Sequence, residues 1–301
     1  MLYTNATDID FKNYKRLFVI GCSFTHWMWP TWADIIHKEH SHLAYRNFGT
    51  AGCGNDYIFT ILNQITREYN LGEKDLVMIM WSSFHRMSVY SGYQSNDALQ
   101  KAILNENPAT EDSVIRNNTW AWGSGDDMLA QLSLNHDQIN CDRGFLIRDL
   151  AIIDTITTLM EKSAYSGACM LSTPINKQDT FDSTAPGTYN DDVLEFYKHL
   201  NEKHLGVPMY DYFNSANEGN FLNSNQKTWE HADGELREDY HPQSINYYNY
   251  AKHLGFNFSQ DTEQYCKDCD IKIKQNDLVS HFEEDPNWPY DFRNRHLRYP
   301  L

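Results

Sequence analysis

Apolar residues recur along the chain in two alternating patterns, short continuous runs and stripes at helical spacing. The runs predict buried strands, which we place at Leu17–Gly21, Tyr45–Phe48, Asp75–Trp81, Ala168–Ser172 and Val207–Asp211. The stripes between them predict helices at Thr31–Glu39, Tyr57–Tyr69, Arg148–Ser163 and Asn190–His204. Repeating β-then-α units favour an α/β fold with a parallel sheet covered by helices on both faces.

Two stretches depart from this alternation. Residues from about 88 to 145 are polar and rich in asparagine, and we expect them to form an insertion in the main domain. A long excursion inside a compact fold is more often functional than passive, so a partly helical cap on the substrate side and a simple surface elaboration are both open. Its Trp120 and Trp122 are candidates for stacking on sugar rings, although tryptophans more often fill a core. The polar tail differs again, so we expect a main domain over residues 1–256 and a small extension over residues 257–301.

Composition narrows the functional classes. With 301 residues and 41% hydrophobic content, the chain can bury a large core. A formal net charge of −16 disfavours a nucleic-acid surface, which needs clustered Lys and Arg, and it repels strongly anionic substrates. The sequence shows neither a signal peptide nor the run of about 20 apolar residues that a membrane span needs. We therefore expect a soluble, cytoplasmic protein without nucleic-acid or membrane partners.

A small polar motif, Gly-Cys-Ser-Phe-Thr over residues 21–25, follows the first predicted strand directly. Open α/β sheets bind their ligands at the carboxyl ends of the strands, so this placement makes Ser23 a candidate nucleophile. The alternative is that Ser23 only caps the helix that follows, which taken alone is the commoner role for a serine at such a turn.

A second motif, Asp-Tyr-His-Pro over residues 239–242, stands just before a predicted helix that Ser244 would cap. A serine hydroxyl needs an imidazole to accept its proton and a carboxylate to orient that imidazole. His241 can act as this base from its loop. Asp239, two residues earlier, is the candidate orienting acid, and Glu238 is its rival.

In their content and order these motifs resemble the SGNH or GDSL hydrolases, and among them the divergent phage-type members. Ser23 lies in a segment similar to the nucleophile block, and residues 239–242 are similar to the last block. Residues 47–58 are similar to the second block, which implies that Gly52 donates its backbone N–H to an oxyanion hole; alone, this segment would read as a glycine-rich turn. The resemblance covers about residues 16–256 and implies a three-layer α/β/α, flavodoxin-like SGNH-hydrolase fold with a central parallel sheet.

The third block departs from the family pattern. Where the family has an asparagine that binds the oxyanion, this chain has Trp-Ser-Ser over residues 81–83. Ser83, or else Ser82, would take the place of that donor, and Asn55 is an alternative source of an amide. Loss of a preferred donor costs on the order of 3 kcal/mol of transition-state stabilisation.

The resemblance implies a serine esterase in which Ser23 attacks, His241 transfers the proton and Asp239 orients His241. The expected substrates are neutral carboxylic esters, O-acetyl groups on carbohydrate among them, and catalysis needs no cofactor. The rival hypothesis is a phage structural or accessory binding protein that keeps the fold without activity. A phage-encoded protein would be found in the host cytoplasm or in the virion.

Six scattered cysteines favour reduced thiols over a disulfide framework. Cys266 and Cys269 form a Cys-x-x-Cys pair, which we expect in a turn ahead of a short helix that carries His281. Two thiolates and an imidazole can hold a zinc ion, with His296, Asp285 or a partner as the fourth ligand. We weigh this structural zinc equally against a pair of plain thiols; with zinc, the tail would be an interaction module.

Overall fold

The structure is a computed structural model that describes residues 1–27, 29–50, 52–84, 86–91, 119–124, 142–175, 191–216, 227–230, 236–239 and 241–274. Its centre is a parallel sheet of five strands in the order β1-β7-β4-β2-β3. The strands are β1 (Leu2–Tyr3), β2 (Arg16–Ile20), β3 (Ala44–Asn47), β4 (Asp75–Trp81) and β7 (Ser166–Leu171). The predicted α/β class with a central parallel sheet is confirmed.

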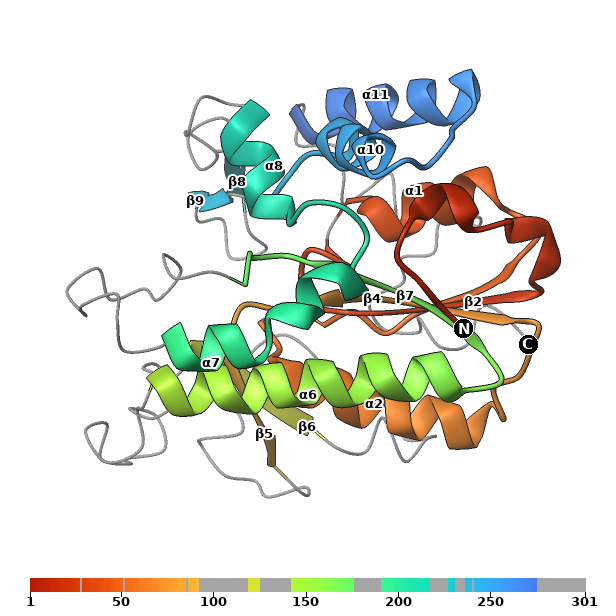
Figure 1. Cartoon of the computed structure of the whole chain (residues 1–301). Helices are drawn as coiled ribbons and strands as arrows, with labels where there is room; N and C mark the ends of the chain where they lie inside the picture. Colours follow the sequence, from red (N-terminus) through yellow and green to blue (C-terminus); the bar gives the residue numbers. More distant parts are fainter. Residues whose placement is uncertain are drawn as a thin grey trace.

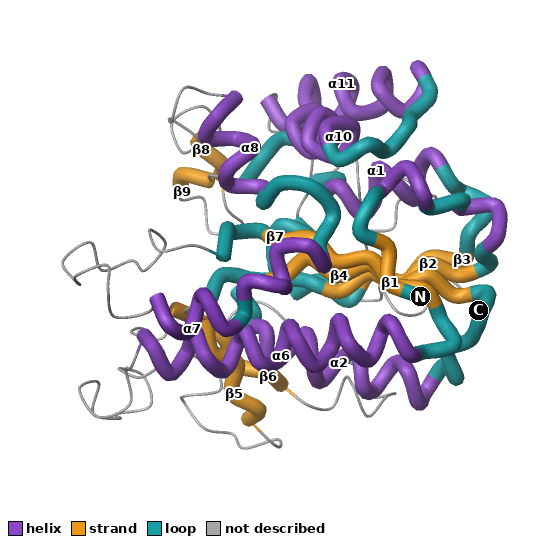
Figure 2. The backbone as a smooth tube through the Cα atoms, viewed as in Figure 1, coloured by secondary structure: helices purple, strands orange, loops and turns teal. Residues whose placement is uncertain are grey.

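Helices cover both faces of this sheet and complete three layers (Figure 1). One face carries α1 (Trp32–Glu39), α8 (Met209–Ala216), α10 (Ser244–His253) and α11 (Gln260–Lys274), and the other carries α2 (Asn55–Glu68), α6 (Asp142–Lys162) and α7 (Asp191–Phe196), as Figure 2 also shows. Short 3-10 helices lie at Ala6–Asp8 (η1), Phe11–Asn13 (η2) and Lys198–Lys203 (η3). Over the described ranges, no helix has both the length and the apolar content needed to cross a membrane.

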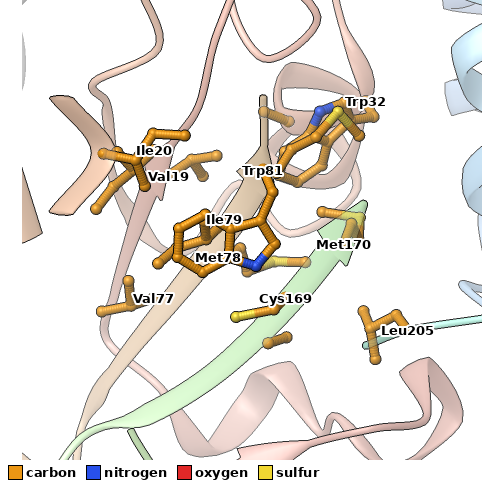
Figure 3. Close-up of a cluster of buried hydrophobic side chains, with 14 of the residues drawn as sticks. Val19, Ile20, Trp32, Val77, Met78, Ile79, Trp81, Cys169, Met170 and Leu205 are labelled. Atoms are coloured by element: carbon orange, nitrogen blue, oxygen red, sulfur yellow. The ribbon is translucent and has the colours of Figure 1, made fainter. Parts of the chain in front are cut away.

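Burial explains why the central strands are apolar along their whole length. Every residue of β4 is buried, because β2 and β7 flank it and helices cover both faces. Burying one large aliphatic side chain contributes about 1.5–3 kcal/mol. Figure 3 shows part of this core, which contains Val19, Ile20, Trp32, Val77, Met78, Ile79, Trp81, Cys169, Met170 and Leu205.

The four longer strands follow the flavodoxin-like order 2-1-3-4 when β2, β3, β4 and β7 are numbered along the chain. The fifth strand predicted at Val207–Asp211 is wrong, because this segment enters α8. Met209 and Phe213 are both buried, and their spacing of four residues places them on one face of a helix. The sheet edge beside β7 is occupied by β1 instead, with Leu2 opposite Gly167.

The predicted helices are observed with shifted ends. Helix α6 begins six residues before the predicted start at Arg148, and the segment predicted as one helix from Asn190 to His204 divides into α7 and η3. The cap of α10 is Gln243, whereas Ser244 is the first helical residue and donates its hydroxyl to the Pro30 carbonyl oxygen at 3.0 Å.

Two antiparallel strand pairs lie outside the main sheet. In the predicted insertion, β5 (Arg86–Ser91) pairs with β6 (Thr119–Ser124), which carries Trp120 and Trp122; the side chains of both tryptophans lie outside the described part of the structure. Ahead of His241, β8 (Lys227–Glu230) pairs with β9 (Leu236–Asp239).

The boundary predicted after residue 256 does not coincide with a break in packing, because α11 lies against α10 and α1 (Figure 1). The Glu39 carboxylate accepts hydrogen bonds from the backbone N–H of Ser259 at 2.8 Å and from the Thr262 hydroxyl at 2.6 Å, which ties the start of α11 to α1. Residues 260–274 are therefore part of the same compact body as the main domain.

The Cys-x-x-Cys pair lies within α11, so the turn predicted there is wrong. A spacing of three residues puts both thiols on one helical face, where Cys266 is 0% and Cys269 is 2% exposed. Burial raises the pKa of Cys269 to about 12, which opposes the thiolate form that zinc binds. The described residues contain no group of three metal-binding side chains, and His281 and His296 lie outside them, so the zinc site stays a prediction.

The amino ends of β2 and β4 are joined by an ion pair at the sheet. Arg16 donates from Nε to Asp75 Oδ1 at 2.5 Å and from Nη2 to Asp75 Oδ2 at 2.6 Å. Asp75 is 2% exposed and also accepts the backbone N–H of Gly72 at 2.7 Å. This bidentate ion pair helps to fix the register of β2 against β4.

Replacing Asp75 with Asn should lower the free energy of unfolding by about 2–4 kcal/mol, because the Arg16 cation loses a buried partner. Urea unfolding followed by circular dichroism measures this loss. The matched control is Glu195→Gln, which removes the ion pair of Glu195 with Lys198 on the exposed surface and should leave stability nearly unchanged. Equal effects of the two substitutions would contradict a structural role for the Asp75 pair.

Candidate active site

A tight turn after β2 carries Ser23 to the carboxyl edge of the sheet. The backbone N–H groups of Thr25 and His26 both donate to the Cys22 carbonyl oxygen, at 2.9 and 3.2 Å. A Cβ atom on Gly21 would lie 2.1 Å from Thr25 Oγ1 and 2.9 Å from the Met80 carbonyl oxygen, so only glycine lets the chain turn this close to β4. Ser23 itself is 4% exposed.

Ser23 does not cap the helix that follows, because α1 begins farther along the chain. Its N-cap is Thr31, whose backbone N–H donates to Asp34 Oδ2 at 2.9 Å. The capping interpretation of Ser23 is therefore wrong for α1.

The loop that follows β3 is hydrogen-bonded to the Ser23 turn. The Thr50 N–H donates to the Gly21 carbonyl oxygen at 2.9 Å, and His26 Nδ1 lies 3.0 Å from the Gly49 carbonyl oxygen. Gly52, the candidate oxyanion donor, has a φ of 75°, a left-handed conformation that favours glycine. Backbone geometry thus explains why glycine stands there, and the two loops lie together at the sheet edge.

The segment after β4 forms the third loop of the site and is held by the second. Ser82 is buried, and its hydroxyl donates to the Cys53 carbonyl oxygen at 2.7 Å. Its backbone N–H donates to Asn55 Oδ1 at 2.8 Å, and Asn55 Nδ2 returns a bond to the Ser82 carbonyl oxygen at 3.2 Å. The Ser82 hydroxyl hydrogen is therefore already used in a hydrogen bond to Cys53. Ser83, the next residue after β4 and Ser82, is half-buried.

Asn55 also joins this loop to α6. Its Nδ2 donates to Asp149 Oδ2 at 3.0 Å, so the two amide hydrogens serve Ser82 and Asp149 and neither is left for an oxyanion. Asp149 is fully buried and pairs with Arg148, whose Nε donates to Asp149 Oδ1 at 2.6 Å. Asn55 thus has a structural role in this arrangement.

His241 lies far from Ser23 in the sequence, but its ring contacts the Ser23 turn. Its ring stacks on Trp27 with centroids 3.7 Å apart and planes 19° apart, and its centroid lies 5.3 Å from that of Phe24. Trp29 Nε1 donates to the Pro242 carbonyl oxygen at 2.7 Å, which anchors the backbone next to His241. The residues that flank Ser23 in sequence therefore contact the predicted base directly.

The candidate orienting acids precede His241 on β9. The backbones of Asp239 and Glu238 pair with Lys227 and Thr228, and their side chains lie outside the described part of the structure. The choice between the two carboxylates stays a prediction.

Tyr210 was missed at this site because its segment was predicted to be a strand. It lies in the first turn of α8, where its ring meets Phe24 edge-on at 5.7 Å and its N–H donates to the Ser172 carbonyl oxygen at 3.0 Å. Burial raises the pKa of the Tyr210 hydroxyl, and the nearby Arg86 opposes that shift. Arg86 Nη1 in turn lies 3.3 Å from Ser82 Oγ, which places a cation beside the third loop.

Neither a family model nor a curated protein matches this sequence. Among solved structures, the chain is similar to a member of the lipolytic protein G-D-S-L family from Veillonella parvula DSM 2008, with a TM-score of 0.36 and 11% identity over 80% of this chain and 98% of that chain. It is also similar to LAE5, an alpha/beta hydrolase enzyme from the metagenome of Lake Arreo, Spain, with a TM-score of 0.39 and 11% identity over 85% of this chain and 95% of that chain. These similarities are too weak to carry a functional argument, and the fold follows from the strand order and layers.

Burial raises the pKa of Asp149 to about 7 against the opposing effects of Arg148 and Asn55. The folded protein then holds this proton more tightly than the unfolded chain, so the contribution of Asp149 to stability declines as pH rises from about 4 to about 7. Relative to Asp149→Asn, the wild type should lose stability between pH 5 and pH 7 and level off above pH 8. Urea unfolding across this range measures the difference.

The matched control for this pH dependence is Glu68→Gln, an exposed acid at the end of α2. Its stability curve should run parallel to that of the wild type from pH 5 to pH 8. Parallel curves for Asp149→Asn as well would contradict the raised pKa.

Proposed function

We propose that this protein is a serine hydrolase of the SGNH type that cleaves a carboxylic ester. The observation that carries the proposal is the contact of the His241 ring with Phe24 and Trp27, on the turn that holds Ser23. Chain segments far apart in sequence thus bring a hydroxyl and an imidazole to one end of the sheet, where α/β folds bind their ligands.

In the proposed mechanism, Ser23 Oγ attacks the ester carbonyl carbon while His241 accepts the hydroxyl proton. The tetrahedral intermediate collapses as His241 returns that proton to the leaving alcohol, which leaves an acyl group on Ser23. Water, activated by His241, then releases the carboxylic acid. Asp239 orients the imidazole and stabilises its charged form, with Glu238 as the alternative.

The oxyanion of the intermediate would be held by the backbone N–H groups of Ser23 and Gly52 and by the Ser83 hydroxyl. The hydrogen bonds of the third loop support this choice of side chain. The hydrogens of Ser82 and Asn55 are used within the protein, so Ser83 is the better donor of the three candidates.

The proposed substrates are neutral esters, with O-acetyl groups on carbohydrate as the first candidates to test. The net charge of −16 supports this class, because it repels strongly anionic molecules. The resemblance of the sequence motifs to phage-type members is part of the same proposal, and it would place the enzyme in the host cytoplasm or the virion.

A binding protein without activity is the second candidate function. It is favoured by one observation, the use of both Asn55 amide hydrogens and the Ser82 hydroxyl within the fold, which leaves a single side-chain hydroxyl at the third loop. Labelling of Ser23 by an active-site reagent separates the two candidates, because a decayed site does not activate its serine.

Ser23→Ala should abolish labelling by a fluorophosphonate and reduce kcat/KM for 4-nitrophenyl acetate at least about 1,000-fold, because the nucleophile is lost. His241→Ala should lower kcat/KM by a similar factor. The double variant, Ser23→Ala with His241→Ala, should have a kcat/KM no lower than that of either single variant. The matched control is Ser163→Ala, which removes an exposed hydroxyl that bonds the Leu159 carbonyl oxygen. Labelling that persists in Ser23→Ala would show that the nucleophile is elsewhere.

Ser83→Ala should lower kcat roughly 100-fold with little change in KM, because the hydroxyl donates only to the charge that develops in the transition state. Steady-state kinetics on the same ester measure both constants. Thr50→Ser serves as the control, since it retains a hydroxyl in the second loop next to Tyr57 and should keep kcat. An unchanged kcat in Ser83→Ala would remove Ser83 from the oxyanion hole.

A further inference from the structure

The His241 ring stacks face to face on the indole of Trp27. The ring centroids are 3.7 Å apart and the planes differ by 19°. Trp27 is half-buried on the loop between β2 and α1, and the proposed mechanism assigns it no role. An indole face this close to an imidazole has both steric and electrostatic consequences.

The electrostatic consequence follows from the ring quadrupole of tryptophan. A cation within about 6 Å of an indole centroid is attracted to its negative face, and tryptophan is the strongest of the aromatic residues in this respect. During ester cleavage His241 passes through a positively charged form. The stacked indole therefore favours that form over neutral imidazole.

The steric consequence depends on how firmly Trp27 is held. Trp29 meets it edge-on, with centroids 6.3 Å apart and planes at 86°. Trp29 is fully buried and also donates to the Pro242 carbonyl oxygen. The same loop therefore contacts the ring of His241 through Trp27 and the backbone next to His241 through Trp29. This arrangement restricts rotation of the imidazole.

We propose that Trp27 is a positioning residue for His241, which it orients by stacking and stabilises in its protonated form while a proton is transferred. This inference rests on the proposed serine hydrolase function. It adds a group that shares the task usually left to the orienting carboxylate.

Other titratable groups lie on neighbouring segments and stay unchanged in the variants below. Among the described side chains they include His26 on the same loop as Trp27, Tyr210 against Phe24, and Arg86 and Cys22, which act electrostatically on Tyr210. Asp270 accepts the Ile245 N–H of α10 at 3.4 Å. Asp239 and Glu238 precede His241 along the chain. Because none of them is altered, a change in the titration of His241 reports the loss of the indole.

The direct test is an NMR titration of the His241 ring protons in the wild type, Trp27→Phe and Trp27→Leu, with the signal assigned by its absence in His241→Asn. Trp27→Leu should lower the midpoint by about half to one pH unit, and Trp27→Phe should lie in between. The pH profile of fluorophosphonate labelling should move in the same direction, and kcat should fall with little change in KM. The matched control is Trp32→Phe, a buried indole on α1, which should leave the midpoint in place.

The outcomes separate this inference from the proposed function. If wild-type Ser23 is labelled but the midpoint in Trp27→Leu is unchanged or higher, Trp27 is only a packing residue and the inference is overturned. If wild-type Ser23 is not labelled, the proposed function fails and the inference fails with it. Should Trp27→Leu not fold, as judged by circular dichroism, the shift in Trp27→Phe decides alone.

Discussion

Parallel pairing of β2 with β3 on one side and β4 on the other fixes where the candidate site lies. Val19 is opposite Asn47 and Ile20 is opposite Ile79, so all three strands end close together. The loops that follow them carry Ser23, Gly52 and Ser83. Because parallel strands point the same way, a single register sets the relative positions of the proposed nucleophile and oxyanion donors. The Arg16–Asp75 pair secures that register at the opposite end.

The loop between β2 and α1 holds the parts of the candidate site together, because it forms hydrogen bonds with β3 and with the start of α10. The Thr25 carbonyl oxygen accepts from the Thr31 hydroxyl at 2.7 Å and from Asn47 Nδ2 at 2.9 Å, which closes the loop on itself and on β3. Trp29 and the Pro30 carbonyl oxygen bond to the start of α10. These bonds can hold a side chain such as Ser23 in one geometry without help from a bound ligand.

The sequence predicts the parts of this fold that depend on burial alone. Strands covered on both faces must be apolar, so β2 and β4 were predicted within a residue of their observed bounds. The strand predicted at Val207–Asp211 is wrong because a short apolar segment fits a strand or a helix equally well, and here Met209 and Phe213 belong to a helix. The stack of Trp27 on His241 and the bonds of Asn55 to Ser82 and Asp149 depend on tertiary proximity, which no local pattern encodes. Motif order indicated Ser23 and His241, but not what holds them.

The hydrogen bonds of the third loop explain why Asn55 is a poor candidate for the proposed oxyanion hole. An amide that could serve an oxyanion instead joins the end of β4 to the buried Asp149, a group whose burial costs stability once it is ionised. Asn55 and Arg148 offset part of that cost, so redirecting the Asn55 amide toward a substrate would take one of these two partners from Asp149. The Ser83 hydroxyl makes no hydrogen bond of this kind among its described contacts. In a site where Ser23 is 4% exposed, the low local dielectric strengthens even one neutral hydrogen bond to a developing charge.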